Sequence, residues 1–241
     1  MGIFDIFSGR GKSPRCAAVI VAAGSSERMG ADKLMMKLGE LPVLVRTLTA
    51  FQRAEEISEI VVVTRTEAVE RIADLCSENG IDKISKVVAG GKTRMESSLI
   101  GVSAVSSGAK LIAIHDAARP LVSGELIRRT VTAAAEHMAA VPVIPSTDTL
   151  KVVDDNELVV GTVDRSNTYR VQTPQVFDAV LIKGALTRAA EKGLVLTDDS
   201  AAVDMTGFRS FAVAGEDDNI KITTPRDIAI AEALLKIRGE E

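Results

Sequence analysis

Short apolar runs rich in β-branched residues alternate along this chain with segments whose apolar residues recur every three or four positions. The first pattern predicts strands buried in a sheet, and the second predicts amphipathic helices. Together they predict a mostly parallel, doubly wound α/β sheet with right-handed crossovers. The expected strands cover 19–23, 60–63, 84–89, 110–114 and 140–144, and the expected helices cover 42–54, 67–79, 95–105 and 123–137.

The pattern changes after Asp148. Residues 149–153 and 157–163 alternate apolar and polar positions around the turn Asp154-Asp155-Asn156, which predicts an inserted β-hairpin. A two-stranded ribbon is marginal alone, so an arm over about residues 147–168 is expected to pack on a second copy of the chain and form a homodimer.

The remaining pattern completes a single domain over residues 15–241. It predicts strands over 169–177, 209–214 and, as a short edge strand, 219–222, with helices over 178–191, 198–205 and 225–238. Residues 1–14 are expected to form a flexible N-terminal tail, with a weak membrane-surface role as the alternative.

Composition narrows the class of function. A net charge of −4 argues against a nucleic-acid binder, and a chain without Trp and with Tyr169 as its one Tyr offers few stacking platforms for bases. No apolar run is long enough to span a membrane. Cys16 and Cys76 match no metal-site spacing, so buried reduced thiols in a cytoplasmic protein are expected.

Three loops rich in small residues or cations follow predicted strands, at 24–33, 90–94 and 116–119. The carboxyl ends of parallel strands meet at one sheet edge, where open α/β sheets bind ligands. Glycines let the backbone approach a polyanion, and the cations can neutralise it, which favours a triphosphate and a second phosphorylated substrate. The competing interpretation is ordinary turns carrying solvated charges. The charged residues concerned are Arg28, Lys33, Lys92, Arg94, Asp116 and Arg119.

Five motifs in this order and spacing resemble those of the 2-C-methyl-D-erythritol 4-phosphate cytidylyltransferase family, over about residues 16–238. They are Ala-Ala-Gly-x-x-x-Arg-Met-x-x-x-Lys at 22–33, His-Asp-Ala-Ala-Arg-Pro at 115–120, Thr-Pro-Gln at 173–175, Thr-Asp-Asp at 197–199 and Asn-Ile-Lys-Ile-Thr at 219–223. The resemblance implies a Rossmann-like nucleotidyltransferase sheet with a dimerisation arm. It also implies transfer of the cytidylyl group of CTP to 2-C-methyl-D-erythritol 4-phosphate, with release of pyrophosphate, in the non-mevalonate route to isoprenoids.

The resemblance also implies roles for individual residues. Arg28 and Lys33 would stabilise the transition state at the CTP phosphates, and Lys221 would hold the attacking phosphate. Arg165 would be a catalytic residue and would also bind the acceptor. Together with Thr149 it would reach the site of the partner subunit. The remaining CTP-binding residues would be Ala22, Ala23, Gly24, Gly91, Ser97 and Ala117, and the remaining acceptor-binding residues Asp116, Arg119 and Thr197.

Some residues are expected to have other roles. Many relatives have Asp where this chain has Lys92, so only a backbone contact is expected there. His115 should be structural because its side chain alternates away from that of Asp116 along the strand. Asp198 and Asp199 can be explained as caps of the helix that follows. Mg²⁺ is expected to be carried mainly by the CTP phosphates, with no metal site built by protein ligands.

Two other functions remain open at this stage. A ribitol 5-phosphate cytidylyltransferase would share the CTP loops and differ in the acceptor. A regulatory module that binds CTP without turnover belongs to a different class, and it would not need Arg28, Lys33 and Lys221 together.

Overall fold

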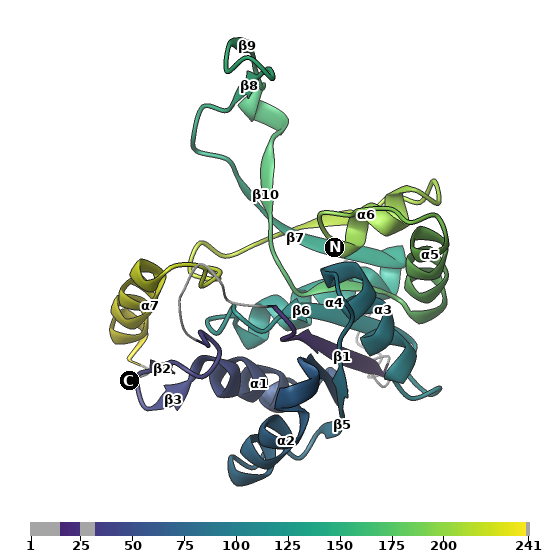
Figure 1. The fold of residues 1–241 in the computed structure, drawn as a ribbon, viewed down its shortest axis with the longest axis vertical. Helices are drawn as coiled ribbons and strands as arrows, with labels where there is room; N and C mark the ends of the chain where they lie inside the picture. The colour runs from purple at the N-terminus through teal and green to yellow at the C-terminus, as the bar shows by residue number, and fades with distance from the viewer. Residues whose placement is uncertain (1–14, 25–31, 240–241) are drawn as a thin grey trace, which may run out of the picture.

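The centre of the molecule is an eight-stranded sheet between two layers of helices (Figure 1). This computed structural model describes residues 15–24 and 32–239, so the predicted tail lies outside the described residues. The strand order is β10-β7-β11-β6-β1-β4-β5, with β12 paired to β7. The prediction of a mostly parallel, doubly wound α/β sheet is confirmed.

Four parallel strands form the half of the sheet that carries the loops of interest. They are β1 (Cys16–Val21), β4 (Ile57–Thr64), β5 (Ile84–Ala89) and β6 (Leu111–Asp116). Alternate residues of β1 point to opposite faces: Ala18 and Ile20 join one apolar cluster, and Val19 joins the other. Burial on both faces explains why β1, β6 and most of β4 read as apolar runs, whereas the edge strand β5 is partly exposed.

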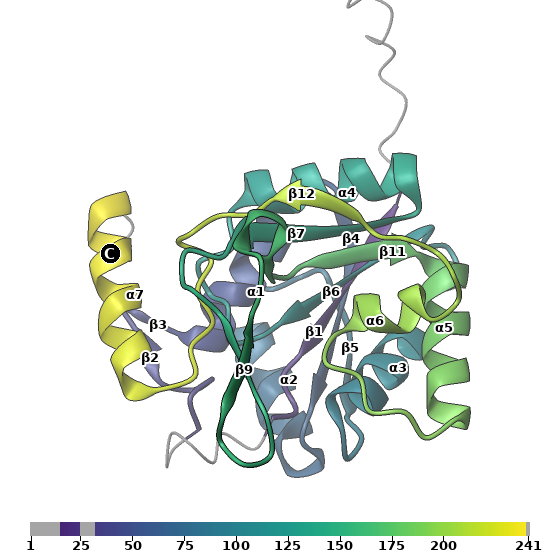
Figure 2. The same ribbon diagram turned by 90° about the horizontal axis from the view of Figure 1, so that it is seen from above.

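The first helical layer contains α1 (Val43–Arg53), α2 (Val69–Glu78) and α4 (Gly124–His137), with a 3-10 turn η2 (Thr66–Ala68) before α2. Ser123 caps α4, since its Oγ accepts from the backbone N–H of Leu126 at 2.9 Å. Helix α7 (Pro225–Arg238) lies at the edge of this layer beside β2 (Lys37–Leu38) and β3 (Leu41–Pro42), as Figure 2 shows. The opposite layer contains α3 (Arg94–Ala104), α5 (Ala179–Glu191) and α6 (Asp199–Asp204).

The other half of the sheet is mixed. The predicted strand over 169–177 is two strands, β10 (Tyr169–Val171) and β11 (Gln175–Asp178), and both run antiparallel to β7 (Ala139–Pro145). β11 lies between β6 and β7, while β12 (Phe211–Ala214) runs parallel to β7. Alternation within a segment indicates a strand and says nothing about the neighbour with which it pairs.

The predicted edge strand over 219–222 is wrong, because this segment is irregular in the structure. Its backbone groups bond elsewhere: the Asn219 carbonyl accepts from Arg119 at 2.7 Å, and the Ile222 N–H donates to the Ala118 carbonyl at 2.8 Å. The alternation of Ile220 and Ile222 imitates a strand, but the two side chains only anchor a loop on the core.

The inserted hairpin is present and projects from the body of the molecule (Figure 1). It contains β8 (Lys151–Val153), β9 (Val159–Thr162) and a 3-10 turn η3 (Arg165–Asn167), and β8 pairs only with β9 in the described structure. Asp154 closes the turn, since its Oδ1 accepts from the N–H groups of Asn156 and Leu158 at 2.9 Å. The ribbon exposes large apolar side chains, namely Val152, Val153, Leu158, Val159 and Val160.

Two further expectations concern cysteines and membranes. Cys16 and Cys76 are buried free thiols, as predicted. Within the described ranges, none of the helices has the length and apolar character needed to cross a bilayer.

Candidate active site

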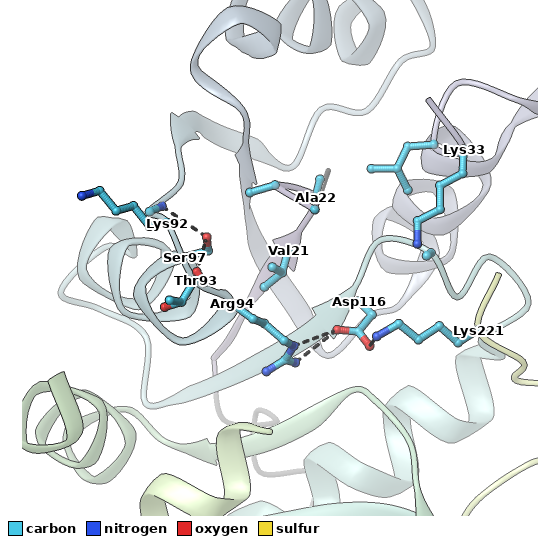
Figure 3. Close-up of a pocket in the computed structure, with 14 residues that line it drawn as sticks. Val21, Ala22, Lys33, Lys92, Thr93, Arg94, Ser97, Asp116 and Lys221 are labelled. Carbon is cyan, nitrogen blue, oxygen red and sulfur yellow. Dashed lines mark hydrogen bonds and ion pairs between the residues drawn. The ribbon is translucent and has the colours of Figure 1, made fainter. Parts of the chain in front are cut away.

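A pocket of about 450 Å³ opens where the carboxyl ends of β1 and β6 meet the loop before α3 (Figure 3). This volume is in the usual range for small-molecule sites. Each of the three predicted loops contributes described residues to the pocket, so their predicted convergence is confirmed. The wall is formed by Val21, Ala22, Ala23, Gly24, Lys33, Leu34, Gly91, Lys92, Thr93, Arg94, Ser97, Asp116, Ala118 and Lys221.

Residues 90–93 form a loop with two glycines, here called the glycine loop, which is held by the first turn of α3. Thr93 caps α3, with its Oγ1 accepting from the Glu96 N–H at 3.1 Å. Ser97 Oγ donates to the Thr93 carbonyl at 2.9 Å and accepts from the Gly91 N–H at 3.2 Å. These bonds fix the backbone of the loop against the pocket before any ligand arrives.

Gly90 is required by a close approach of the loop to its surroundings. A Cβ on this residue would lie 2.8 Å from the Ala23 Cβ and 2.8 Å from Ser97 Oγ, which is closer than such atoms can approach. Only glycine lets the loop lie this close to the end of β1.

Asp116, at the end of β6, is surrounded by cations. Its Oδ1 accepts from Arg94 Nε at 3.2 Å and Arg94 Nη2 at 3.1 Å, and its Oδ2 lies 2.8 Å from Lys221 Nζ. Arg119 Nε is farther away, 3.8 Å from Oδ2. Burial alone would raise the pKa of this carboxyl, but Arg94, Lys221 and Arg119 hold it well below its usual range, so Asp116 is ionised at neutral pH.

Lys221 reaches the pocket from the irregular segment near the end of the chain. Asn219 anchors this segment, with its Nδ2 donating to the Thr173 carbonyl at 2.9 Å, and the Ile222 N–H bonds to Ala118. The Ile222 carbonyl in turn accepts from Lys33 Nζ at 3.1 Å. Two predicted cations from opposite ends of the sequence therefore lie at the same pocket.

Lys33 follows a carboxylate that is held by two arginines. Asp32 Oδ2 accepts from Arg65 Nη2 at 2.8 Å and from Arg71 Nη2 at 2.9 Å. Arg65 follows β4 and Arg71 lies in α2, so these ion pairs tie the end of the first loop to the helical layer. This anchor fixes the backbone from which Lys33 extends.

His115 has the structural role that the sequence predicts. Its ring is fully buried, with Nε2 3.2 Å from the Arg119 carbonyl and Nδ1 3.0 Å from Thr173 Oγ1. Burial lowers the pKa of this imidazole to about 3, so it is neutral and does not act as a base in the pocket.

Most of the predicted site residues line the pocket. Ala22, Ala23, Gly24, Gly91, Ser97, Lys33, Asp116 and Lys221 line the pocket together. Ala117 does not, because it is fully buried in the core and the next residue, Ala118, takes its place in the wall. Arg28 lies outside the described residues.

The other acceptor candidates lie away from the pocket wall. Arg119 is mostly buried behind it and bonds to the Asn219 carbonyl, and Thr197 is exposed just before α6. Thr149 and Arg165 are exposed on the projecting arm, so this chain does not bring them to its own pocket (Figure 1). The side chain of Lys92 lines the pocket but points away from Asp116 in Figure 3.

The sequence interpretation missed how Arg94 and Asp199 are used. Asp198 caps α6 as expected, accepting from the Ala201 N–H at 3.1 Å. Asp199 is instead fully buried, with its Oδ2 2.8 Å from Arg94 Nη2. The doublet of aspartates signals a helix start, and nothing local in the sequence shows that the second carboxylate turns inward.

Comparisons with known proteins agree with the motifs. The family model for 2-C-methyl-D-erythritol 4-phosphate cytidylyltransferase matches residues 16–237. A curated relative with that name from Caldanaerobacter subterraneus subsp. tengcongensis is 41% identical over 227 residues, covering 91% of this chain and 98% of the relative. Another from Halalkalibacterium halodurans is 38% identical over 221 residues, covering 91% and 96%.

Solved structures show the same fold. The 4-diphosphocytidyl-2C-methyl-D-erythritol synthase of Anaerococcus prevotii superimposes with a TM-score of 0.83 at 34% identity, covering 93% of this chain and 97% of that one. The 2-C-methyl-D-erythritol 4-phosphate cytidylyltransferase of Thermus thermophilus superimposes with a TM-score of 0.75 at 32% identity, covering 90% and 98%. Since the family model spans most of the chain and the relatives align over nearly their whole length, this chain belongs to the 2-C-methyl-D-erythritol 4-phosphate cytidylyltransferase family.

Proposed function

We propose that the pocket at the carboxyl edge of the sheet is where this nucleotidyltransferase joins its two substrates. The enzyme transfers the cytidylyl group of CTP to 2-C-methyl-D-erythritol 4-phosphate, giving 4-diphosphocytidyl-2-C-methyl-D-erythritol and pyrophosphate for isoprenoid synthesis. The observation that carries the assignment of the site is the meeting of Lys33, Asp116 and Lys221 beside a preformed glycine loop.

The cytidine of CTP lies against the backbone of β1 and of the glycine loop. Ala22, Ala23 and Gly24 line one side, and Gly91 and Ser97 line the other. Small residues let main-chain N–H and C=O groups reach the edge of a pyrimidine, and a purine is too large for the same slot. Ala117 supports this wall from the core behind Ala118 and has no side chain contact with the nucleotide.

The acceptor lies at the Asp116 end of the pocket. The ionised carboxylate accepts from sugar hydroxyls, and Lys221 Nζ, 2.8 Å from Asp116 Oδ2, holds the acceptor phosphate near the α-phosphorus of CTP. Arg119 and Thr197 also contact the acceptor in this proposal, and Thr149 and Arg165 are supplied by the arm of a second subunit.

The reaction needs no protein nucleophile. The acceptor phosphate attacks the α-phosphorus in line with the departing pyrophosphate, and negative charge builds on the equatorial and leaving oxygens. Lys33 and Arg28 stabilise that charge from the loop after β1. In this proposal catalysis therefore consists of positioning the substrates and of electrostatic stabilisation by cations.

Mg²⁺ is carried by the triphosphate in this proposal. Across residues 15–24 and 32–239 no group of three or more His, Cys, Asp or Glu side chains could hold a metal ion. Asp116 is the carboxylate that lines the pocket, and both of its oxygens already face cations. A metal bound to the phosphates would neutralise part of their charge, and no protein cage is needed for that.

The enzyme acts as a homodimer in this proposal. The arm cannot be stable as an isolated ribbon, and its exposed valines and leucine offer an apolar surface for a second copy of the chain. Residues 15–241 act as one catalytic domain with this arm. The free thiols of Cys16 and Cys76 favour the cytoplasm.

The activity is tested by measuring pyrophosphate release from CTP with each acceptor in turn. Turnover is expected with 2-C-methyl-D-erythritol 4-phosphate, whose name the relatives carry, and not with ribitol 5-phosphate. Preference for ribitol 5-phosphate would overturn the acceptor assignment. Tight CTP binding with no pyrophosphate release under either acceptor would indicate a regulatory module.

A further inference from the structure

One guanidinium joins two buried carboxylates beside the pocket. Arg94 Nη2 lies 3.1 Å from Asp116 Oδ1 and 2.8 Å from Asp199 Oδ2, and Arg94 Nε donates to Asp116 Oδ1 at 3.2 Å. Figure 3 shows the Arg94 side chain reaching from α3 to Asp116, with Lys221 on the other side of that carboxylate. The fork of an arginine can serve two acceptors at once, which a lysine ammonium does with less defined geometry.

The three residues come from three segments that form different parts of the pocket. Arg94 is the first residue of α3, directly after the loop whose Gly91 faces the nucleotide end. Asp116 is the last residue of β6, at the acceptor end. Asp199 begins α6, two residues after Thr197. The guanidinium therefore links the nucleotide loop to two segments on the acceptor side.

The ion pairs of Arg94 with Asp116 and Asp199, here called the bridge, set the orientation of the Asp116 carboxylate. Its Oδ1 is turned to Arg94 and its Oδ2 to Lys221 at 2.8 Å, so both oxygens are fixed before an acceptor binds. Asp116 also faces Arg119 Nε at 3.8 Å, and its chain neighbour His115 is buried and neutral. Without Arg94 the carboxylate could follow Lys221, whose side chain is 40% exposed.

The bridge also holds α6. The side chain of Asp199 is 1% exposed, and a buried carboxylate without a cation is costly. Burial raises the pKa of Asp199 and Arg94 opposes this shift. Loss of the guanidinium would leave Asp199 to take up a proton or turn to water, and either change would displace the start of α6.

We propose that Arg94 is a positioning residue for the acceptor, acting through Asp116 directly and through Asp199 on the segment that carries Thr197. The proposal rests on the proposed function for the identity of the acceptor. Arg94 itself need not touch either substrate. A role limited to packing would affect the two substrates alike, so the test separates them.

The first test is kinetic and uses Arg94→Met, with Arg94→Lys as the conservative variant. We expect kcat/KM for the acceptor to fall about 10- to 100-fold, as for loss of a group that orients a reacting partner, while KM for CTP changes less than about threefold. Arg94→Lys should recover only part of the loss. Arg128→Met is the matched control, since Arg128 pairs with Glu125 on the exposed surface of α4, and it should match wild type.

Asp199→Asn tests the second half of the bridge and serves if Arg94→Met folds poorly. It should lower kcat/KM for the acceptor by a smaller factor than Arg94→Met does. The double variant should have the same kcat/KM for the acceptor as Arg94→Met alone, because Asp199 acts through Arg94. The proposal would be overturned if kcat/KM fell equally for CTP and for the acceptor. It would also be overturned if the effects of the two substitutions on kcat/KM for the acceptor added in the double variant.

The second test needs no substrate. The pKa of Asp116 is measured by carboxyl-selective NMR on the nucleotide-free protein. The positive charge of Arg94 is the largest single cause that lowers the pKa of the Asp116 carboxyl. Arg94→Met should therefore raise the pKa of Asp116 clearly, whereas Arg128→Met should not. An unchanged Asp116 pKa would refute the bridge. Wild-type turnover tests the proposed function separately, so failure of one is distinguishable from failure of the other.

Discussion

The arm projects from the body of its own chain, so each active site is expected to combine the body of one subunit with the arm of the other (Figure 1). Two variants isolate these contributions. Lys33→Ala removes a cation of the body, and Arg165→Ala removes one of the arm. Each homodimer should lose about 100-fold or more in activity, as when a preorganised donor to the transition state is removed.

The expected recovery follows from counting intact sites. A heterodimer of the two variants has one site with both Lys33 and Arg165 and one site with neither. Its activity should therefore be about half that of a wild-type dimer. Random re-pairing of equal amounts makes about half of the dimers heterodimers, so the mixture should reach about a quarter of wild-type activity.

The assay is pyrophosphate release after the two homodimers have been dissociated, mixed and re-paired. Subunit exchange is measured independently with differently tagged chains. A mixture of wild-type and doubly substituted chains is the control, because a heterodimer of these two chains has no site with both Lys33 and Arg165. Demonstrated exchange with no recovery above the two homodimers would mean that the arm serves its own chain, and the shared site would be refuted.

Four further predictions follow from the site and the core. Arg28→Ala or Lys33→Ala should lower kcat by about 100-fold or more with the fold intact; an unchanged kcat with a raised KM for CTP would contradict a transition-state role. Calorimetry should detect no tight Mg²⁺ binding by the nucleotide-free protein. Tight binding would refute the proposal that Mg²⁺ enters the site bound to the CTP phosphates. Burial lowers the pKa of His115 from 6.5 to about 3, so its contribution to stability is complete above pH 6.5 and is lost as pH falls toward 3; it should lower the free energy of unfolding by up to about 1.4 kcal/mol per pH unit there, and His115→Gln should make the acid dependence shallower. Gly90→Ala should weaken CTP binding, because its Cβ would lie 2.8 Å from side chains on both sides; unchanged affinity would show that the loop can move away without loss.

Sequence patterns located most of the elements because burial leaves a local trace. The continuous apolar runs of β1 and β4 record burial on both faces of the sheet, and the three-to-four residue spacing in α1 and α4 records burial of one face. Parallel strands place their carboxyl ends at one edge, so the sequence alone indicates that the loops after β1, β5 and β6 meet.

Strand pairing left no such trace. Residues 169–177 read as a single strand, but the chain makes two strands that pair antiparallel with β7. Residues 219–222 read as an edge strand, but their backbone groups bond to Arg119 and Ala118, and the segment stays irregular. Alternation reports which side chains are buried, whereas pairing depends on a neighbour that is distant in sequence.

Local periodicity and the geometry of parallel strands are enough to predict the fold class, most of the elements and the edge at which the charged loops meet. Which charges pair depends on the folded chain. Arg94, Asp116, Asp199 and Lys221 come from four separate segments, and their partners depend on how far each side chain reaches and how deeply it is buried. Local sequence does not encode those distances, so Asp199 read as a helix cap, while packing turned its side chain into the core.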